Sequence, residues 1–185
     1  MRSRTLLPAL PLLLVACANG GPAHVTERRA FQGDAPRGEA LLRQTALDRH
    51  NRARAALGLP ALRWNDALAA AARAYAEQLA RTRRFEHAPH PPGQVPQGEN
   101  LWMGTRGAYR YDEMLGHWLA EKRYYRARPT PDFSTTGDYR DVAHYTQMVW
   151  RATTDMGCAL ASNDSDDYLV CRYLPGGNVV GRMAY

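Results

Sequence analysis

The last third of the chain carries two short apolar runs that have the pattern of paired strands. Residues 156–160 and 168–173 are separated by residues 162–167, which are rich in the Asn, Asp and Ser that favour turns. Each run contains one cysteine, Cys158 in the first and Cys171 in the second. The pattern predicts a β-hairpin in which a cross-strand disulfide is plausible outside the cytoplasm, while two reduced thiols remain the alternative.

The first residues resemble an export signal. Arg2 and Arg4 precede an apolar stretch, Leu6 to Ala16, that is too short to span a membrane. Leu14 to Cys17 then resembles a bacterial lipobox, in which the cysteine is lipidated and becomes the first mature residue. We therefore expect a signal peptide over residues 1–16 and a membrane partner reached through a lipid anchor on Cys17. The alternative is an ordinary signal peptide followed by a chance cysteine.

Export of the protein agrees with its cysteine count. The chain has three cysteines, so lipidation of Cys17 leaves Cys158 and Cys171 as a pair. Ala18 stands where an aspartate typically retains lipoproteins at the inner membrane. We expect an exported lipoprotein of the cell envelope, at the outer membrane or in the periplasm, or else a secreted protein.

Composition narrows the class of protein further. The 185 residues include 24 Lys and Arg against 18 Asp and Glu, so 24 − 18 gives the net charge of +6. The arginines are spread along the whole chain without dense blocks or interleaved aromatics, which argues against a nucleic-acid partner. With 45% hydrophobic and 23% charged residues, the chain has the composition of a globular protein. Its length suits one domain plus an extension.

The order of helical and strand-like patterns predicts an α+β fold. Residues 17–38 lack periodicity and are rich in Gly, Pro and Arg, so they predict a flexible tether before a domain at 39–185. An apolar stripe at spacings of four, three and four indicates a helix that begins at Asn65 or Asp66. Because helices come first and strands late, we expect helices packed on a small antiparallel sheet. The expected helices cover residues 39–57, 65–84, 111–124 and 143–150, with a short strand at 99–102.

Four potential metal ligands stand at the ends of predicted elements. Imidazoles and carboxylates suit zinc, and two histidines with open positions leave room for water. Their gaps of 12, 22 and 23 residues match no local metal motif, so spacing alone does not bring them together. His90, close to the first ligand, and His117, four residues before the third, are rivals. The four candidates are His87, Glu99, Glu121 and His144.

Two other observations bear on the candidate site. Trp118 and Glu121 are three residues apart on one predicted helix, so they share a face and Glu121 turns toward the buried side. The spacing of His117 and Glu121 also fits an exposed contact on that helix. The sequence contains no nucleophile elbow, HExxH, P-loop or GxGxxG motif, which argues against the familiar hydrolases and nucleotide enzymes.

Several ordered motifs resemble the CAP superfamily of cysteine-rich secretory proteins, antigen 5 and plant pathogenesis-related proteins, also called the SCP domain. Residues 144–150 resemble the first signature of this family, and residues 168–179 resemble the second. Earlier matches are His50-Asn51 with Arg54, then residues 62–65 and the Gly-Glu-Asn motif at residues 98–101. The likeness covers nearly the whole domain.

The resemblance implies a three-layer α-β-α sandwich with a central cleft that holds two histidines and two glutamates. Carried over by motif, these are His87, Glu99, Glu121 and His144, and the histidines of the family can hold a divalent ion such as zinc. Ala88 stands where the family often has Ser, and Ala143 replaces the polar residue or glycine usual before the signature histidine.

The loop from residue 124 to residue 134 resembles an aromatic segment with which some fungal members bind sterols. Tyr124, Tyr125 and Phe133 are present, but packing of the loop onto the sandwich is an equally good interpretation. His50, Asn51 and Trp64 carry apolar neighbours and are expected to serve hydrogen-bonded packing instead of ligation.

Three functional hypotheses follow. We expect a non-enzymatic module that presents its His/Glu cleft to a small-molecule, lipid or peptide ligand, with zinc as an optional ion. The first alternative is a zinc-dependent, peptidase-like hydrolase with Glu99 or Glu121 as general base. The second alternative is a lipid or sterol carrier that uses the aromatic loop.

Overall fold

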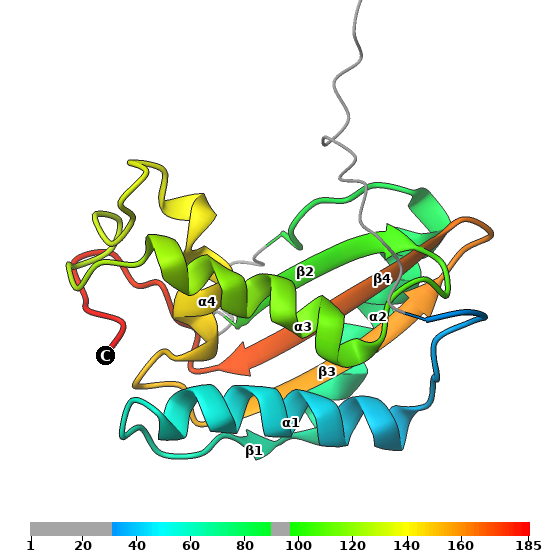
Figure 1. Ribbon diagram of the computed structural model, residues 1–185, viewed down its shortest axis with the longest axis horizontal. Coiled ribbons are helices and arrows are strands. Elements are labelled where there is room, and N and C mark those ends of the chain that lie inside the picture. Colours follow the sequence, from blue (N-terminus) through cyan, green and yellow to red (C-terminus); the bar gives the residue numbers. More distant parts are fainter. Residues whose placement is uncertain (1–30, 90–96) are drawn as a thin grey trace, which may run out of the picture.

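The computed structural model describes residues 31–89 and 97–185 (Figure 1). The expected signal peptide, the lipidated Cys17 and the first part of the expected tether lie outside the described residues. The described end of that tether already contacts the domain, since Ala35 is buried and its amide donates to Gly107 O at 2.9 Å. Within the described part of the chain, no helix is both long enough and apolar enough to cross a membrane.

A four-stranded sheet in the order β1-β3-β4-β2 forms the middle of the molecule. Strands β2 (Gly98–Thr105), β3 (Asp155–Ser162) and β4 (Asp166–Leu174) are antiparallel, as the sequence predicts. The fourth strand, β1 (Arg63–Trp64), pairs in parallel with β3, so the sheet is mixed. Two residues are too few to leave a strand pattern in the sequence, which is why only the structure reveals β1.

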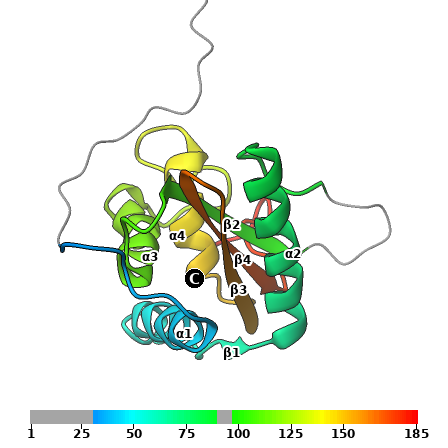
Figure 2. The ribbon, with the colours of Figure 1, turned by 90° about the vertical axis from the view of Figure 1, so that its right-hand side faces the viewer.

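Helices cover both faces of this sheet and create three layers (Figure 2). Helices α1 (Glu39–Ala55) and α3 (Tyr111–Ala120) pack on one face around Trp102, Leu169 and Tyr173. Helix α2 (Asp66–Thr82) packs alone on the other face, against Leu101, Tyr168 and Val170. The α-β-α sandwich implied by the family resemblance is therefore confirmed.

Shorter helical segments follow α3 at the end of the sandwich where β2 begins. A 3-10 turn, η1 (Glu121–Tyr124), continues directly from α3, and a second, η2 (Tyr139–Asp141), precedes helix α4 (Ala143–Met148). The single helix expected over residues 111–124 is thus an α-helix with a tighter last turn. These segments carry two of the four candidate ligands.

Local sequence explains where α2 begins and ends. Asn65 has extended backbone geometry and its side-chain oxygen accepts a hydrogen bond from Leu68 N at 3.1 Å, which satisfies one of the free amides of the first turn. The expected stripe of Leu68, Ala72, Tyr75 and Leu79 is buried. The helix stops at Arg83, which adopts the left-handed conformation with φ 56°.

The disulfide predicted between the last two strands is present. Cys158 and Cys171 face each other in the β3–β4 register, with 4.1 Å between their Cα atoms. The two strands are thus joined at directly opposite residues, on the side of the sheet that faces α1. The alternative of two reduced thiols is not what the structure shows.

The fully buried Arg54 ties the end of α1 to three other segments. Its guanidinium donates to Pro60 O at 2.7 Å, Trp150 O at 2.8 Å and Thr153 O at 3.1 Å, and more weakly to Met148 O at 3.3 Å. These carbonyls belong to the loop after α1, to the end of α4 and to the turn between α4 and β3. One side chain therefore satisfies main-chain acceptors that burial would otherwise leave without donors.

Replacing Arg54 by leucine should strongly destabilise the fold. The change removes the donors of several buried carbonyls, and each unsatisfied group costs about 1–3 kcal/mol, so we expect a loss of at least about 3 kcal/mol in the free energy of unfolding. Urea denaturation would measure it. The matched control is Arg52→Leu, an exposed arginine of the same helix, which should change stability by no more than about 0.5 kcal/mol. Equal effects of the two changes would contradict this role of Arg54.

His50 is a core residue, as expected from its helix position. Its Nδ1 lies 2.7 Å from Ala46 O, which can only accept, so Nδ1 carries the proton and Nε2 accepts from the Tyr173 hydroxyl at 2.9 Å. Complete burial lowers the pKa of His50 to about 4, because the charged imidazolium loses its hydration. Asn51 next to it bonds both main-chain groups of Leu62.

Stability should therefore fall as the pH drops below neutrality. The folded-state pKa of about 4 lies below the ordinary 6.5, so the unfolded chain binds more protons between these values. The contribution of His50 is fully present above pH 6.5 and declines toward pH 4, by roughly 3 kcal/mol at most. The free energy of unfolding measured across this window should lose much of its slope in His50→Gln. An unchanged slope in that variant would disprove the assignment.

Candidate functional site

One histidine–glutamate pair joins the end of α3 to the start of α4. Nδ1 of His144 lies 2.6 Å from Oε1 of Glu121. The other oxygen of Glu121 accepts from the main-chain amides of His144 and Tyr145, both at 3.0 Å. The carboxylate thus receives three donors, and the imidazole is held by a short hydrogen bond whose proton lies on Nδ1 when the ring is neutral.

Trp118 fixes the orientation of this pair. Its ring stacks on His144, with 5.8 Å between ring centroids and 12° between the planes. Its indole Nε1 donates to Leu101 O at 3.2 Å, on the outer edge of β2. Trp118 and Glu121 therefore act at the same junction, in agreement with the shared helix face that their spacing predicts.

The second pair joins the segment after α2 to β2. Nδ1 of His87 lies 2.7 Å from Oε1 of Glu99, and the amide of Ala88 donates to the same oxygen at 3.0 Å. Ala88 contributes only its main chain, so the serine common here in the family is not needed for this contact. The histidine is largely exposed, at 62%, whereas the glutamate is only 6% exposed.

Arg172 completes this pair, although the sequence alone assigns it no role at the site. Its guanidinium lies 2.8 Å from Oε2 of Glu99 and 5.2 Å from the centre of the Tyr75 ring. Glu99 and Arg172 are direct partners in the β2–β4 register, so their side chains share one face of the sheet. The missing information was this register, which the two isolated strand patterns do not fix.

The two pairs meet β2 at consecutive residues. Glu99 belongs to the first pair, and the side-chain amide of Asn100 donates to His144 O at 3.1 Å in the second. Adjacent residues of a strand point to opposite faces, so the side chains of Glu99 and Asn100 leave β2 on its two sides. The structure brings the four predicted residues into two pairs, and within the described residues no group of three or more His, Cys, Asp or Glu forms a ready-made metal cluster.

Glycine at position 98 lets β2 begin this close to α4. A Cβ atom there would lie 2.1 Å from the side-chain oxygen of Gln147, too close for any other residue without a shift. The same oxygen accepts from Gly177 N at 2.7 Å. In the Gly-Glu-Asn motif, Gly98 therefore allows β2 to approach α4 closely, Glu99 is a ligand candidate, and Asn100 anchors α4 through His144 O.

The other residues singled out from the sequence have different surroundings. His117 accepts a hydrogen bond from Trp102 Nε1 at 2.9 Å and stacks on that ring. His90 lies outside the described residues. In the aromatic loop, Phe133 is completely buried, and Tyr124 and Tyr125 pack partly buried against the same cluster. These contacts hold the loop on the sandwich.

Each carboxylate determines which tautomer its neutral histidine adopts. A neutral imidazole that donates from Nδ1 to a carboxylate presents an unprotonated Nε2, which is the form that binds metal ions and accepts hydrogen bonds. Both candidate histidines have this arrangement. The site is therefore a pair of oriented imidazole acceptors supported by buried or half-buried carboxylates.

An α-β-α sandwich with two carboxylate-supported histidines beside its edge strand defines the class of protein. The chain belongs to the CAP family, described as the cysteine-rich secretory protein family, whose model matches residues 47–173, more than half of the chain. It is 38% identical over 143 residues to pathogenesis-related protein 1C of Nicotiana tabacum, covering 77% of this chain and 80% of the relative. It is 34% identical to a second pathogenesis-related protein, from Hordeum vulgare, over 74% of this chain and 79% of the relative.

Solved structures share the fold. A crystal structure of NaASP2 with Zn2+ superposes with a TM-score of 0.66 at 23% identity, over 82% of this chain and 89% of the other. An outer surface protein from Borrelia burgdorferi gives a TM-score of 0.54 at 17% identity, over 80% of this chain and 100% of the other. At these identities the likeness establishes the three-layer architecture.

Replacing Arg172 by methionine should destabilise the protein through Glu99. The change leaves a buried carboxylate without its guanidinium partner, and breaking a buried ion pair from one side costs about 3–5 kcal/mol. Denaturant unfolding would measure the loss. The double variant Glu99→Gln/Arg172→Met removes both charges and should recover a large part of it. If the double variant were as unstable as the sum of the two single changes, the pair would not be coupled as described.

Proposed function

We propose that this protein is an exported, non-enzymatic ligand-binding module whose His87 and His144 can hold a divalent metal ion. The observation that supports the proposal is that the Nδ1 of each histidine is hydrogen-bonded to its own carboxylate, which leaves Nε2 of the neutral ring as a Lewis base. A small-molecule, lipid or peptide ligand would bind at these imidazoles, directly or through the ion.

The residues present fit zinc. Two neutral imidazoles are suitable ligands, and the carboxylates behind them fix their orientation. Bound zinc would supply a Lewis acid with open positions for donor atoms of a ligand. The structurally similar NaASP2 was crystallised with Zn2+, which supports a metal at this kind of fold.

The contacts of the two glutamates favour binding over hydrolysis. Glu121 already accepts three hydrogen bonds, and Glu99 accepts two and pairs with Arg172. A general base needs an oxygen free to take a proton from water. In the peptidase-like alternative, Glu121 would have to give up one of these donors, or Glu99 would have to separate from Arg172, since its Oε2 accepts no hydrogen bond and is held only in that ion pair. Turnover of a peptide library with added zinc, abolished by Glu99→Gln or Glu121→Gln, would favour that alternative.

The proposal includes a location in the cell envelope. The lipobox-like residues up to Cys17 favour a lipid anchor, and the Cys158–Cys171 disulfide favours an oxidising compartment. The outer surface protein of Borrelia burgdorferi with the same fold supports a role for such domains outside the cell. The membrane would be reached through the lipid and the ligand through the two histidines.

Calorimetric titration of zinc into the full-length chain should show one-to-one binding that is lost in His87→Ala/His144→Ala. The reason is that each of these two imidazoles is held at Nδ1 by a carboxylate, which leaves Nε2 as a ligand. Glu99→Gln and Glu121→Gln should each weaken binding by about tenfold to a hundredfold, since they loosen the support of one ligand.

Two controls make this experiment specific. His117→Ala alters a histidine that bonds Trp102, and His90→Ala alters one close to His87 in the sequence. Both variants should bind zinc like the unmodified chain. Absence of binding in the unmodified chain, or loss of binding in either control alone, would refute the metal site proposed at His87 and His144.

A further inference from the structure

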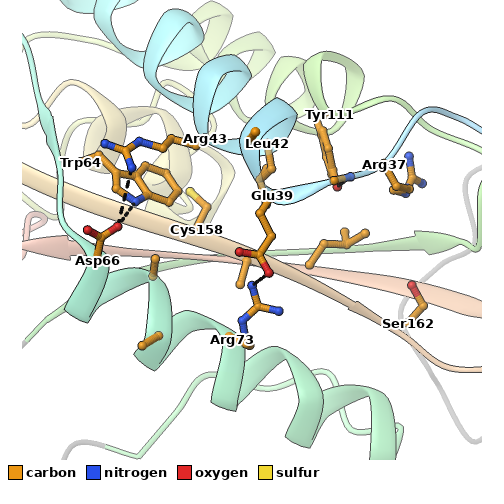
Figure 3. Close-up of a pocket in the computed structure, with 16 residues that line it drawn as sticks. Arg37, Glu39, Leu42, Arg43, Trp64, Asp66, Arg73, Tyr111, Cys158 and Ser162 are labelled. Atoms are coloured by element: carbon orange, nitrogen blue, oxygen red, sulfur yellow. Dashed lines mark hydrogen bonds and ion pairs between the residues drawn. The ribbon is translucent and has the colours of Figure 1, made fainter.

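A second cleft lies at the opposite edge of the sheet from the histidine–glutamate pairs. It has a volume of about 770 Å³ and runs along β3 between α1 and α2 (Figure 3). Its floor is formed by residues 158–160 and Ser162 of β3, and its walls carry Glu39 of α1 and Arg73 of α2. This size is typical of ligand clefts.

The floor of this cleft is an unpaired strand edge. Strand β1 covers β3 only at its start, where Arg63 N donates to Thr154 O and Asn65 N donates to Met156 O. The chain then leaves the edge, because α2 begins at Asp66. Beyond this point β3 has no neighbour on its outer side among the described residues.

The alternation of the strand identifies which main-chain groups face the cleft. Since Met156 O points outward to β1, the groups of Cys158, Leu160 and Ser162 point the same way. The odd-numbered residues bond to β4, as Asn163 N does to Asp166 O at 2.9 Å. The cleft therefore offers a row of donors and acceptors at the spacing of a strand, the arrangement used when proteins bind a peptide by adding a strand.

We propose that this cleft binds an extended peptide segment that carries an acidic side chain. The peptide pairs with the outer edge of β3 beyond the end of β1, through the main-chain groups of Leu160 and its neighbours. Its carboxylate binds Arg73 in place of Glu39. The site is separate from the two histidines and does not depend on metal binding there.

The charges of the cleft specify the acidic side chain. Its lining includes three arginines, Arg37, Arg43 and Arg73, which form ion pairs with Asp167, Asp66 and Glu39. The partner of Arg37 is buried, whereas the pair of Arg73 with Glu39 lies open across the floor of the cleft. Figure 3 shows Glu39 reaching from α1 across β3 to form an ion pair with Arg73 of α2. Both side chains are exposed, at 81% and 45%, so the pair contributes little stability and opens readily. Glu39 thus occupies the position that the carboxylate of a peptide would take.

A capped peptide of sequence threonine–valine–glutamate–valine–threonine is a suitable probe. Titrated into the isotope-labelled full-length chain, it should shift and protect from hydrogen exchange the amides of Leu160 and Ser162. Arg73→Gln should weaken its binding by roughly threefold, the effect of one exposed ion pair. Glu39→Gln should strengthen binding, because it removes the competing carboxylate from Arg73.

Matched variants separate this model from general charge effects. Arg81→Gln and Glu77→Gln change the same charges on α2 at residues that do not line the cleft, and should leave binding unchanged. Leu160→Pro removes the outward N–H, which an edge strand tolerates, and should weaken binding by about fivefold relative to Leu160→Ala, which keeps it. A probe with glutamine in place of glutamate should bind the unmodified chain more weakly than the glutamate probe does. The two probes should bind the Arg73→Gln variant with equal affinity.

Four outcomes would overturn the proposal. They are no binding at millimolar probe, binding that perturbs amides elsewhere, an opposite or absent effect of Glu39→Gln, and protection of Leu160 that rises with protein concentration without any probe. The last would assign the edge to a second copy of the chain. Zinc binding at the histidines is measured separately, so its presence or absence does not decide the outcome.

Discussion

The buried guanidinium of Arg54, whose partners among the described residues are main-chain carbonyls, organises one end of this molecule. The guanidinium of Arg54 points to carbonyl oxygens before β1, at the end of α4 and before β3. Burial of a charge is costly unless every donor finds an acceptor, so these segments can pack only in the arrangement that surrounds the guanidinium. The position of α4, and therefore of His144, follows from that requirement.

The same logic of satisfied polar groups holds the candidate site. Glu121 bonds the first amides of α4 as well as the imidazole of His144, so one carboxylate both positions the helix and orients the ligand. Glu99 is balanced by Arg172 from the neighbouring strand and by the amide of Ala88. Structural support and ligand orientation are thus provided by the same atoms, which explains why a binding surface can be built on so small a sheet.

Much of the fold could be predicted because its signals are local. The stripe of α2, its cap at Asn65 and the turn-rich loop of the β3–β4 hairpin depend on residues close together in the sequence. The roles of Arg172 and Arg54 could not be predicted in this way, since the first depends on strand register and the second on carbonyls up to 99 residues away. The four site residues could be predicted only from their match to family motifs. Their spacing in the sequence gives no reason to join His87 to Glu99 or Glu121 to His144, because the two pairs form only when the chain folds.

The Cys158–Cys171 bridge has a mechanical consequence. It joins directly opposite residues of β3 and β4, while the free edge of β3 lies beside α1 and α2. Traction applied to β3 from its outer side would load a covalent bond to the centre of the sheet before it could shear the hydrogen bonds between the strands. The domain is therefore reinforced against pulling at a strand whose outer edge is open.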